Sequence, residues 1–141
     1  DRDVTKFSLD EMVGSLSRLS VLGIIEKITL FMDVTYVNPE ESSGLLWDYP
    51  DLPEKISILS SNSNGETSQL FNDKKHSFFT YSLLKGLSGN ADDGDNIIDL
   101  GEVTEYVYKS VPENIRNQPG SLRQNPKFNG LDLKRVLLDL R

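Results

Sequence analysis

Residues 27–38 have the sequence Lys27-Ile28-Thr29-Leu30-Phe31-Met32-Asp33-Val34-Thr35-Tyr36-Val37-Asn38. A short apolar run rich in β-branched and aromatic residues is typical of a buried parallel strand, and this run ends on an acid and then on small polar residues. In open α/β sheets, ligands bind just beyond the carboxyl ends of the strands. We therefore expect Asp33 and Thr35 at such an edge, on one face of the strand because side chains alternate.

Two interpretations of this pair are equally supported by the local sequence. An acid beside a hydroxyl could form a pocket floor and a nucleophile. Alternatively, Asp33 caps a turn and Thr35 is an ordinary residue at the end of a strand.

A second strand, residues 55–60, repeats the pattern of an apolar run followed by a polar loop, here residues 60–68. Two parallel strands whose polar loops open on one edge form a shared crevice, which is the usual position of a ligand in this class of fold. Ser61 stands at the start of the second loop. Asp33 and Ser61 are the candidate substrate-binding residues.

The other segments give weaker predictions. The Ser8-Leu9-Asp10-Glu11 spacing of a capping box predicts a helix that starts at Ser8 and ends before Gly23. Further helices are expected over 78–87, buried nearly all round and ending near Gly89, and over 100–110. Long loops are expected over 38–53 and 114–130, and residues 133–140 form either a closing strand or a short amphipathic helix.

His76, the single histidine, stands at the N-terminal edge of the 78–87 helix, where we favour a structural role over catalysis. The acidic segment 90–102 resembles an EF-hand loop, which needs Asp at position 1, Gly at 6 and Glu at 12. Counting back from Glu102 puts Ala91 and Asn96 at positions 1 and 6, and the register that starts at Asp92 fails as well. A turn that leads into a helix is the favoured interpretation, and a calcium-responsive binding domain ranks last among the functions considered.

Composition excludes several classes of function. The 141 residues carry a net charge of −7, which disfavours nucleic acid and anionic lipid as partners. There is no cysteine, which excludes disulfides, thiolate metal sites and a cysteine nucleophile from this chain. We expect one globular, cytoplasmic unit without a cofactor or metal, or a chain that begins after a removed segment.

Taken in order, several segments resemble a caspase-like domain (peptidase family C14) of the metacaspase-related bacterial kind. The similar segments are the helix opened by Ser8-Leu9-Asp10-Glu11, the strand ending in Asp33, Ile58-Leu59-Ser60-Ser61, His76-Ser77-Phe78-Phe79-Thr80-Tyr81-Ser82-Leu83-Leu84-Lys85-Gly86-Leu87, the stretch from Ala91 to Val103, and Gln124-Asn125-Pro126-Lys127-Phe128-Asn129-Gly130.

The resemblance implies that residues 1–141 are the C-terminal portion of a single caspase-like domain. The implied fold is α/β, a three-layer α/β/α sandwich with a mostly parallel sheet that is incomplete without N-terminal strands. The implied activity is that of a cysteine endopeptidase, and Asp33 matches the acid that lines the pocket for an Arg or Lys side chain in metacaspase-like relatives.

The chain departs from the family pattern where catalysis would take place. Thr35 occupies the position of the nucleophilic cysteine, and Val37 and Asn38 replace the Ser and Gly that follow it. A threonine hydroxyl has a far higher pKa than a thiol, so this replacement should abolish most activity. The catalytic histidine of the family lies upstream of this chain, and His76 matches the noncatalytic one.

Two functions follow from this pattern. The first is a pseudo-peptidase that acts as a binding or regulatory module. The alternative is a subunit of a processed caspase-like cysteine endopeptidase that cleaves after Arg or Lys, with catalytic residues supplied outside this chain. In either case the unpaired edge of the sheet predicts association with a missing N-terminal segment or a second protein chain, and a basic peptide is the candidate ligand.

Overall fold

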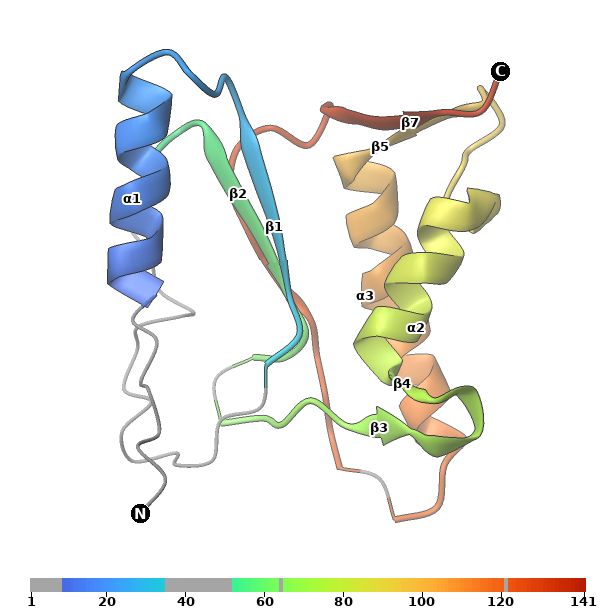
Figure 1. Cartoon of the computed structure of the whole chain (residues 1–141). Helices are drawn as coiled ribbons and strands as arrows, with labels where there is room; N and C mark the ends of the chain where they lie inside the picture. Colours follow the sequence, from blue (N-terminus) through green and yellow to red (C-terminus); the bar gives the residue numbers. More distant parts are fainter. Residues whose placement is uncertain (1–8, 35–51, 64, 121) are drawn as a thin grey trace, which may run out of the picture.

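The computed structural model describes residues 9–34, 52–63, 65–120 and 122–141 (Figure 1). The helices are α1 (Leu9–Val21), α2 (Phe78–Lys85) and α3 (Leu100–Arg116), with short helical turns η1 (Asn72–Lys74) and η2 (Gly86–Asn90). The strands are β1 (Ile28–Met32), β2 (Ile56–Ser60), β3 (Leu70–Phe71), β4 (His76–Ser77), β5 (Ile97–Asp99), β6 (Lys127–Asn129) and β7 (Val136–Asp139).

The largest sheet in this part of the chain has the strand order β1-β2-β6. Strands β1 and β2 are parallel, in register from Ile28 opposite Ile56 to Met32 opposite Ser60, as the two apolar runs predict. The prediction of a mostly parallel sheet is wrong for the described residues. Strand β6 runs antiparallel to β2, and the two-stranded ribbons β3-β4 and β5-β7 are antiparallel too, so the protein is a mixed α/β structure with small sheets.

Alternation along β2 sends its side chains to two different apolar clusters. Ile56 and Ile58 are buried with Val13 of α1, whereas Leu59 is buried with residues of α2 and α3. Figure 1 accordingly shows α1 on one side of the β1-β2 pair and α2 with α3 on the other. All five residues of β2 are buried, including the polar Ser57 and Ser60, as expected for a strand that is covered on both faces.

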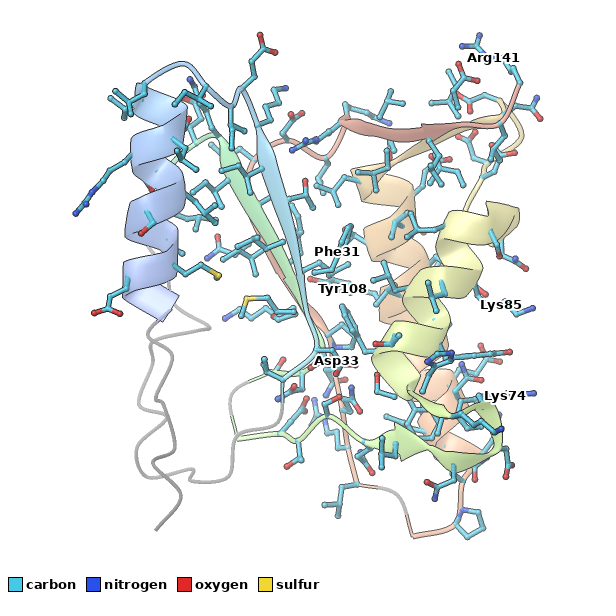
Figure 2. All side chains as sticks on the ribbon, in the orientation of Figure 1. Phe31, Asp33, Lys74, Lys85, Tyr108 and Arg141 are labelled. Carbon is cyan, nitrogen blue, oxygen red and sulfur yellow. The ribbon has the colours of Figure 1, made fainter. Side chains whose placement is uncertain are left out.

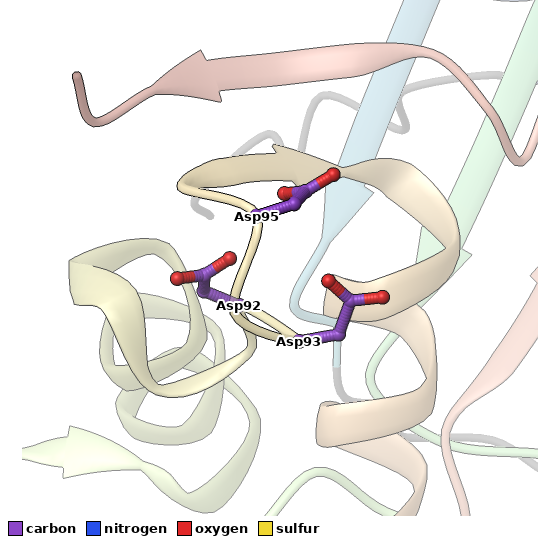
Figure 3. A group of neighbouring side chains, drawn as sticks. All are labelled: Asp92, Asp93 and Asp95. Carbon is purple, nitrogen blue, oxygen red and sulfur yellow. The ribbon is translucent and has the colours of Figure 1, made fainter.

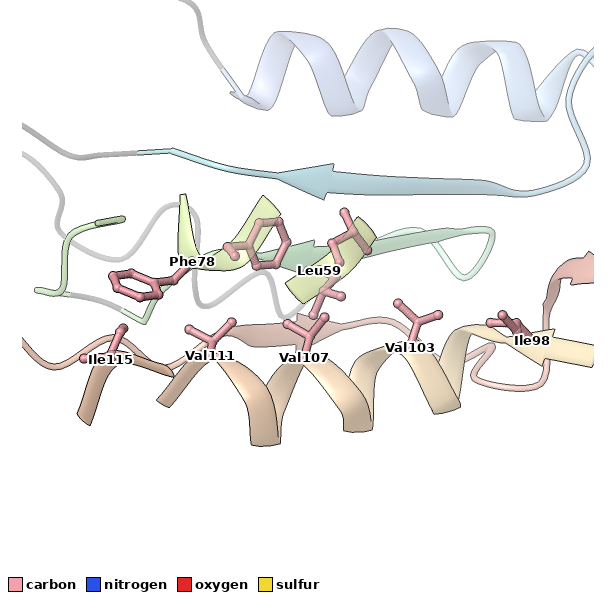
Figure 4. Packing of buried hydrophobic residues seen from close by; sticks show 9 residues of the cluster. Leu59, Phe78, Ile98, Val103, Val107, Val111 and Ile115 are labelled. Atoms are coloured by element: carbon pink, nitrogen blue, oxygen red, sulfur yellow. The ribbon is translucent and has the colours of Figure 1, made fainter. Parts of the chain in front are cut away.

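The larger cluster depends on a stripe along α3 in which buried residues recur at every fourth position (Figure 4). These residues are Val103, Val107, Val111 and Ile115, and they pack with Phe78 and Phe79 of α2. The helix was expected to end near Ser110, and Pro112 lies inside the observed helix although a proline disfavours helical backbone before it. The helix continues to Arg116, since burial of the last two apolar residues of the stripe outweighs that local cost.

Other boundaries differ from the sequence predictions for similar reasons. Helix α2 ends at Lys85 rather than at 87, and Leu84 is half exposed, so the helix is not buried all round. Gly89 has φ +106, a conformation suited to glycine, as expected for a residue near the end of the helix. Strand β6 lies inside the predicted loop 114–130, and residues 136–139 form a strand rather than a helix.

Some predictions fall on residues outside the described ranges. They are the start of the first helix at Ser8, the position of Thr35 and most of the expected loop 38–53. Helix α1 itself is present from Leu9 to Val21, and Gly23 follows it with φ +70. Within the described ranges, none of the helices has the length and apolar character needed to cross a lipid bilayer.

Candidate functional site

Asp33 directly follows β1, at the carboxyl end of the parallel pair, where its carboxylate accepts hydrogen bonds from three hydroxyl groups (Figure 2). Oδ1 accepts from Ser68 at 2.5 Å. Oδ2 accepts from Thr80 at 2.6 Å and from Ser77. Asp33 is solvent-exposed, so its carboxylate is accessible. The three hydrogen bonds hold that carboxylate in one orientation.

The N-terminus of α2 supplies two of these donors. The Ser77 hydroxyl caps the helix by accepting a hydrogen bond from the backbone N–H of Thr80 at 2.9 Å, and it donates its own proton to Asp33. A serine at the cap position is expected to do the first of these tasks. The second places the Asp33 carboxylate beside the N-terminus of α2, whose dipole attracts negative charge.

Ser61 does not lie where a ligand could reach it in the described structure. Its side chain is fully buried, and its hydroxyl donates to Asn62 Oδ1 at 2.6 Å. The same hydroxyl oxygen accepts from the backbone N–H of Val34 at 3.2 Å. Ser61 therefore connects the ends of β1 and β2 and fixes the backbone next to Asp33, and its contact with a substrate stays a prediction.

Gln124 is a residue of this region that sequence reasoning missed. It is 1% exposed, and its amide Nε2 donates to the backbone carbonyl of Ser61 at 2.8 Å. Its Oε1 accepts from the backbone N–H of Gln69 at 2.9 Å. Because Gln69 follows Ser68, the buried amide holds the backbone beside one of the Asp33 donors. The sequence analysis named Gln124 only as the first residue of a segment that resembles the caspase-like family, which gave no signal of this role.

Glu66 joins the same loop to the segment before β6. Its carboxylate accepts hydrogen bonds from the backbone N–H and the side-chain amide of Asn125, both at 2.5 Å, and from the N–H of Ser63 at 3.2 Å. The guanidinium of Arg123 lies 3.4 Å away. With only 14% of its side chain exposed, Glu66 is engaged internally and serves to order the loop.

The acidic segment forms a tight turn between η2 and β5 (Figure 3). Carboxylate oxygens of Asp92, Asp93 and Asp95 lie within 4.8 Å of one another. Asp92 Oδ1 accepts from the backbone N–H groups of Gly94 and Asn96, and Asp95 Oδ1 accepts from that of Ile97. These bonds stabilise the turn, and the favoured sequence interpretation, a turn that leads toward a helix, is confirmed.

The turn leads into α3 through a capping box. Asp99 accepts from the N–H of Glu102 at 2.9 Å, and Glu102 accepts from the N–H of Asp99 at 2.8 Å. Burial would raise the pKa of Asp99, but the backbone N–H of Glu102 and the ammonium of Lys134, 3.1 Å away, outweigh it and lower the pKa. The carboxylate that caps α3 is therefore ionised at neutral pH.

His76 is exposed in β4, opposite Phe71. The residue that caps α2 is its neighbour Ser77, not the histidine. The structure thus brings Asp33 together with Ser68, Ser77 and Thr80, none of which the sequence analysis singled out. Their distances from Asp33 along the chain, 35 to 47 residues, hide this arrangement from local patterns.

Neither a search of known protein families nor a search of curated proteins gave a match to this chain.

Proposed function

We propose that this chain is part of a caspase-like domain, a three-layer α/β/α sandwich, that acts as a pseudo-peptidase and binds or regulates a partner through Asp33. The observation that carries the proposal is the Asp33 carboxylate, exposed at the carboxyl end of β1 and oriented by three hydroxyl donors. An exposed anion held in place suits recognition of a basic side chain.

The absence of a nucleophile supports a binding function over peptide hydrolysis. A cysteine peptidase needs a thiolate with a histidine within hydrogen-bond reach, and this chain has no cysteine. Threonine stands at position 35, and the following Ser and Gly of the family pattern are replaced too. The alternative function, a subunit of a processed endopeptidase specific for Arg or Lys, requires catalytic groups from outside this chain.

One edge of the sheet supports the partner proposed from the sequence. Within the described residues, β1 pairs only with β2 and forms one edge of the three-stranded sheet. A free strand edge presents unpaired N–H and C=O groups that another strand can bind. We propose that an N-terminal segment or a second protein chain adds to this edge.

Replacing Asp33 with asparagine should weaken binding of a basic peptide by about tenfold or more, because an ionised hydrogen-bond acceptor becomes neutral. Fluorescence anisotropy with a labelled peptide that carries one Arg or Lys measures this directly. The matched control is Asp73→Asn, the same chemical change at an exposed acid in η1, which should leave the affinity within about twofold because exposed charges interact weakly with a ligand at a distance.

Equal losses in the two variants would show that binding depends only on net charge. No measurable binding by the wild-type protein would reject the proposed function.

A further inference from the structure

The three hydroxyl donors leave Asp33 with one open hydrogen-bonding position. A carboxylate offers about four lone-pair sites, two on each oxygen. Oδ2 accepts from both Ser77 and Thr80, so its two sites are filled. Oδ1 accepts from Ser68 alone among the described residues, so one site remains. A ligand that keeps these bonds intact can approach only Oδ1.

This distribution separates the two basic side chains that a carboxylate can recognise. An arginine guanidinium gains strength from two parallel N–H bonds, one to each carboxylate oxygen. That arrangement needs one open site on each oxygen, and Oδ2 has none. A lysine ammonium is a compact charge that needs a single acceptor and directs its other donors elsewhere.

We propose that this site selects a lysine side chain over an arginine side chain, and that Thr80 determines the selection. The proposal rests on the proposed function, since it concerns the ligand of the same carboxylate. Thr80 fills the second site of Oδ2 from the first turn of α2, whereas Ser77 is also needed as the cap of that helix. Of the two donors to Oδ2, Thr80 is therefore the one that can be removed with less effect on the helix.

The test compares two labelled peptides that differ only in one residue, Lys or Arg, titrated against the whole chain. The wild-type protein should bind the lysine peptide more tightly, by about threefold or more. At a single open site the compact ammonium places its whole charge beside Oδ1, whereas a guanidinium that makes only one of its two parallel bonds spreads its charge over three nitrogens. The isosteric change Thr80→Val opens one site on Oδ2 while Ser68 still leaves one on Oδ1. This variant should bind the arginine peptide at least as tightly as the lysine peptide.

Ser68→Ala is the matched control, because it opens a second site on Oδ1 and none on Oδ2. It should retain the preference for lysine. Thr80→Ala provides a second variant if the valine disturbs α2, and circular dichroism verifies the fold of each.

The lysine selection would be overturned if the wild-type protein bound both peptides with equal affinity. If Asp33→Asn then lost binding to both peptides, the proposed function would still stand. A lysine preference that persists in Thr80→Val and Thr80→Ala would overturn the role of Thr80. Binding of neither peptide would instead reject the proposed function itself.

Discussion

Replacing Phe78 with alanine should lower the free energy of unfolding by about 3 to 5 kcal/mol, the usual cost of removing a large aromatic side chain from a core. Phe78 is 1% exposed and lies in the larger apolar cluster. Its ring also stacks on Phe71, with centroids 4.6 Å apart. The loss therefore combines a cavity between α2 and α3 with a lost aromatic pair.

Equilibrium unfolding in urea, monitored by circular dichroism, measures this loss. Leu84→Ala on the same helix is the control, because Leu84 is 50% exposed and its truncation should cost less than about 1 kcal/mol. If the two variants lost similar stability, the packing of α2 against α3 described above would be wrong.

Replacing Gly130 with alanine should destabilise the protein by about 2 to 4 kcal/mol or more, because the new methyl group overlaps β2. Gly130 has φ +150 and directly follows β6. A Cβ atom there would lie 2.5 Å from the Oγ, 2.8 Å from the Cβ and 2.9 Å from the Cα of Ser57. A rotamer change of Ser57 relieves only the first of these contacts, so the strands must separate.

Thermal and urea unfolding of Gly130→Ala can be compared with Gly94→Ala to isolate the effect of overlap. Gly94 also has a positive φ, +112, but a Cβ there meets no atom within 4 Å. Gly94→Ala should therefore show backbone strain alone, about 1 kcal/mol. Similar losses in the two variants would mean that β6 does not approach β2 as closely as described.

Features set by local patterns were predictable from the sequence. The apolar spacing of residues 9–21 gives α1, and the two apolar runs give β1 and β2 with their parallel pairing. Features set by distant contacts were not. Strand β6 has three residues and exists through its pairing with β2, almost 70 residues away along the chain, so the loop-forming composition around it was misleading.

The candidate site shows the same division. Asp33 was predictable because an acid that ends an apolar strand is a local signal. Ser61 was recognised as part of the same edge, but its burial and its bond to Val34 depend on how the two strands pair. The Ser77 and Thr80 donors lie on α2, and the supporting amide of Gln124 comes from beyond α3. Only the folded arrangement brings these groups together.

A peptide-cleavage assay on the full-length protein from its native source tests the central claim most directly, once intact mass and N-terminal sequencing have established whether further residues precede this chain. The substrate is a fluorogenic Arg/Lys peptide, assayed with the wild-type protein, Thr35→Cys and Thr35→Ala. We predict no cleavage by the wild-type protein, and cleavage by Thr35→Cys when a histidine-bearing segment precedes this chain. Cleavage by the wild-type protein at a rate unchanged in Thr35→Ala would place the nucleophile outside this chain and contradict the pseudo-peptidase function.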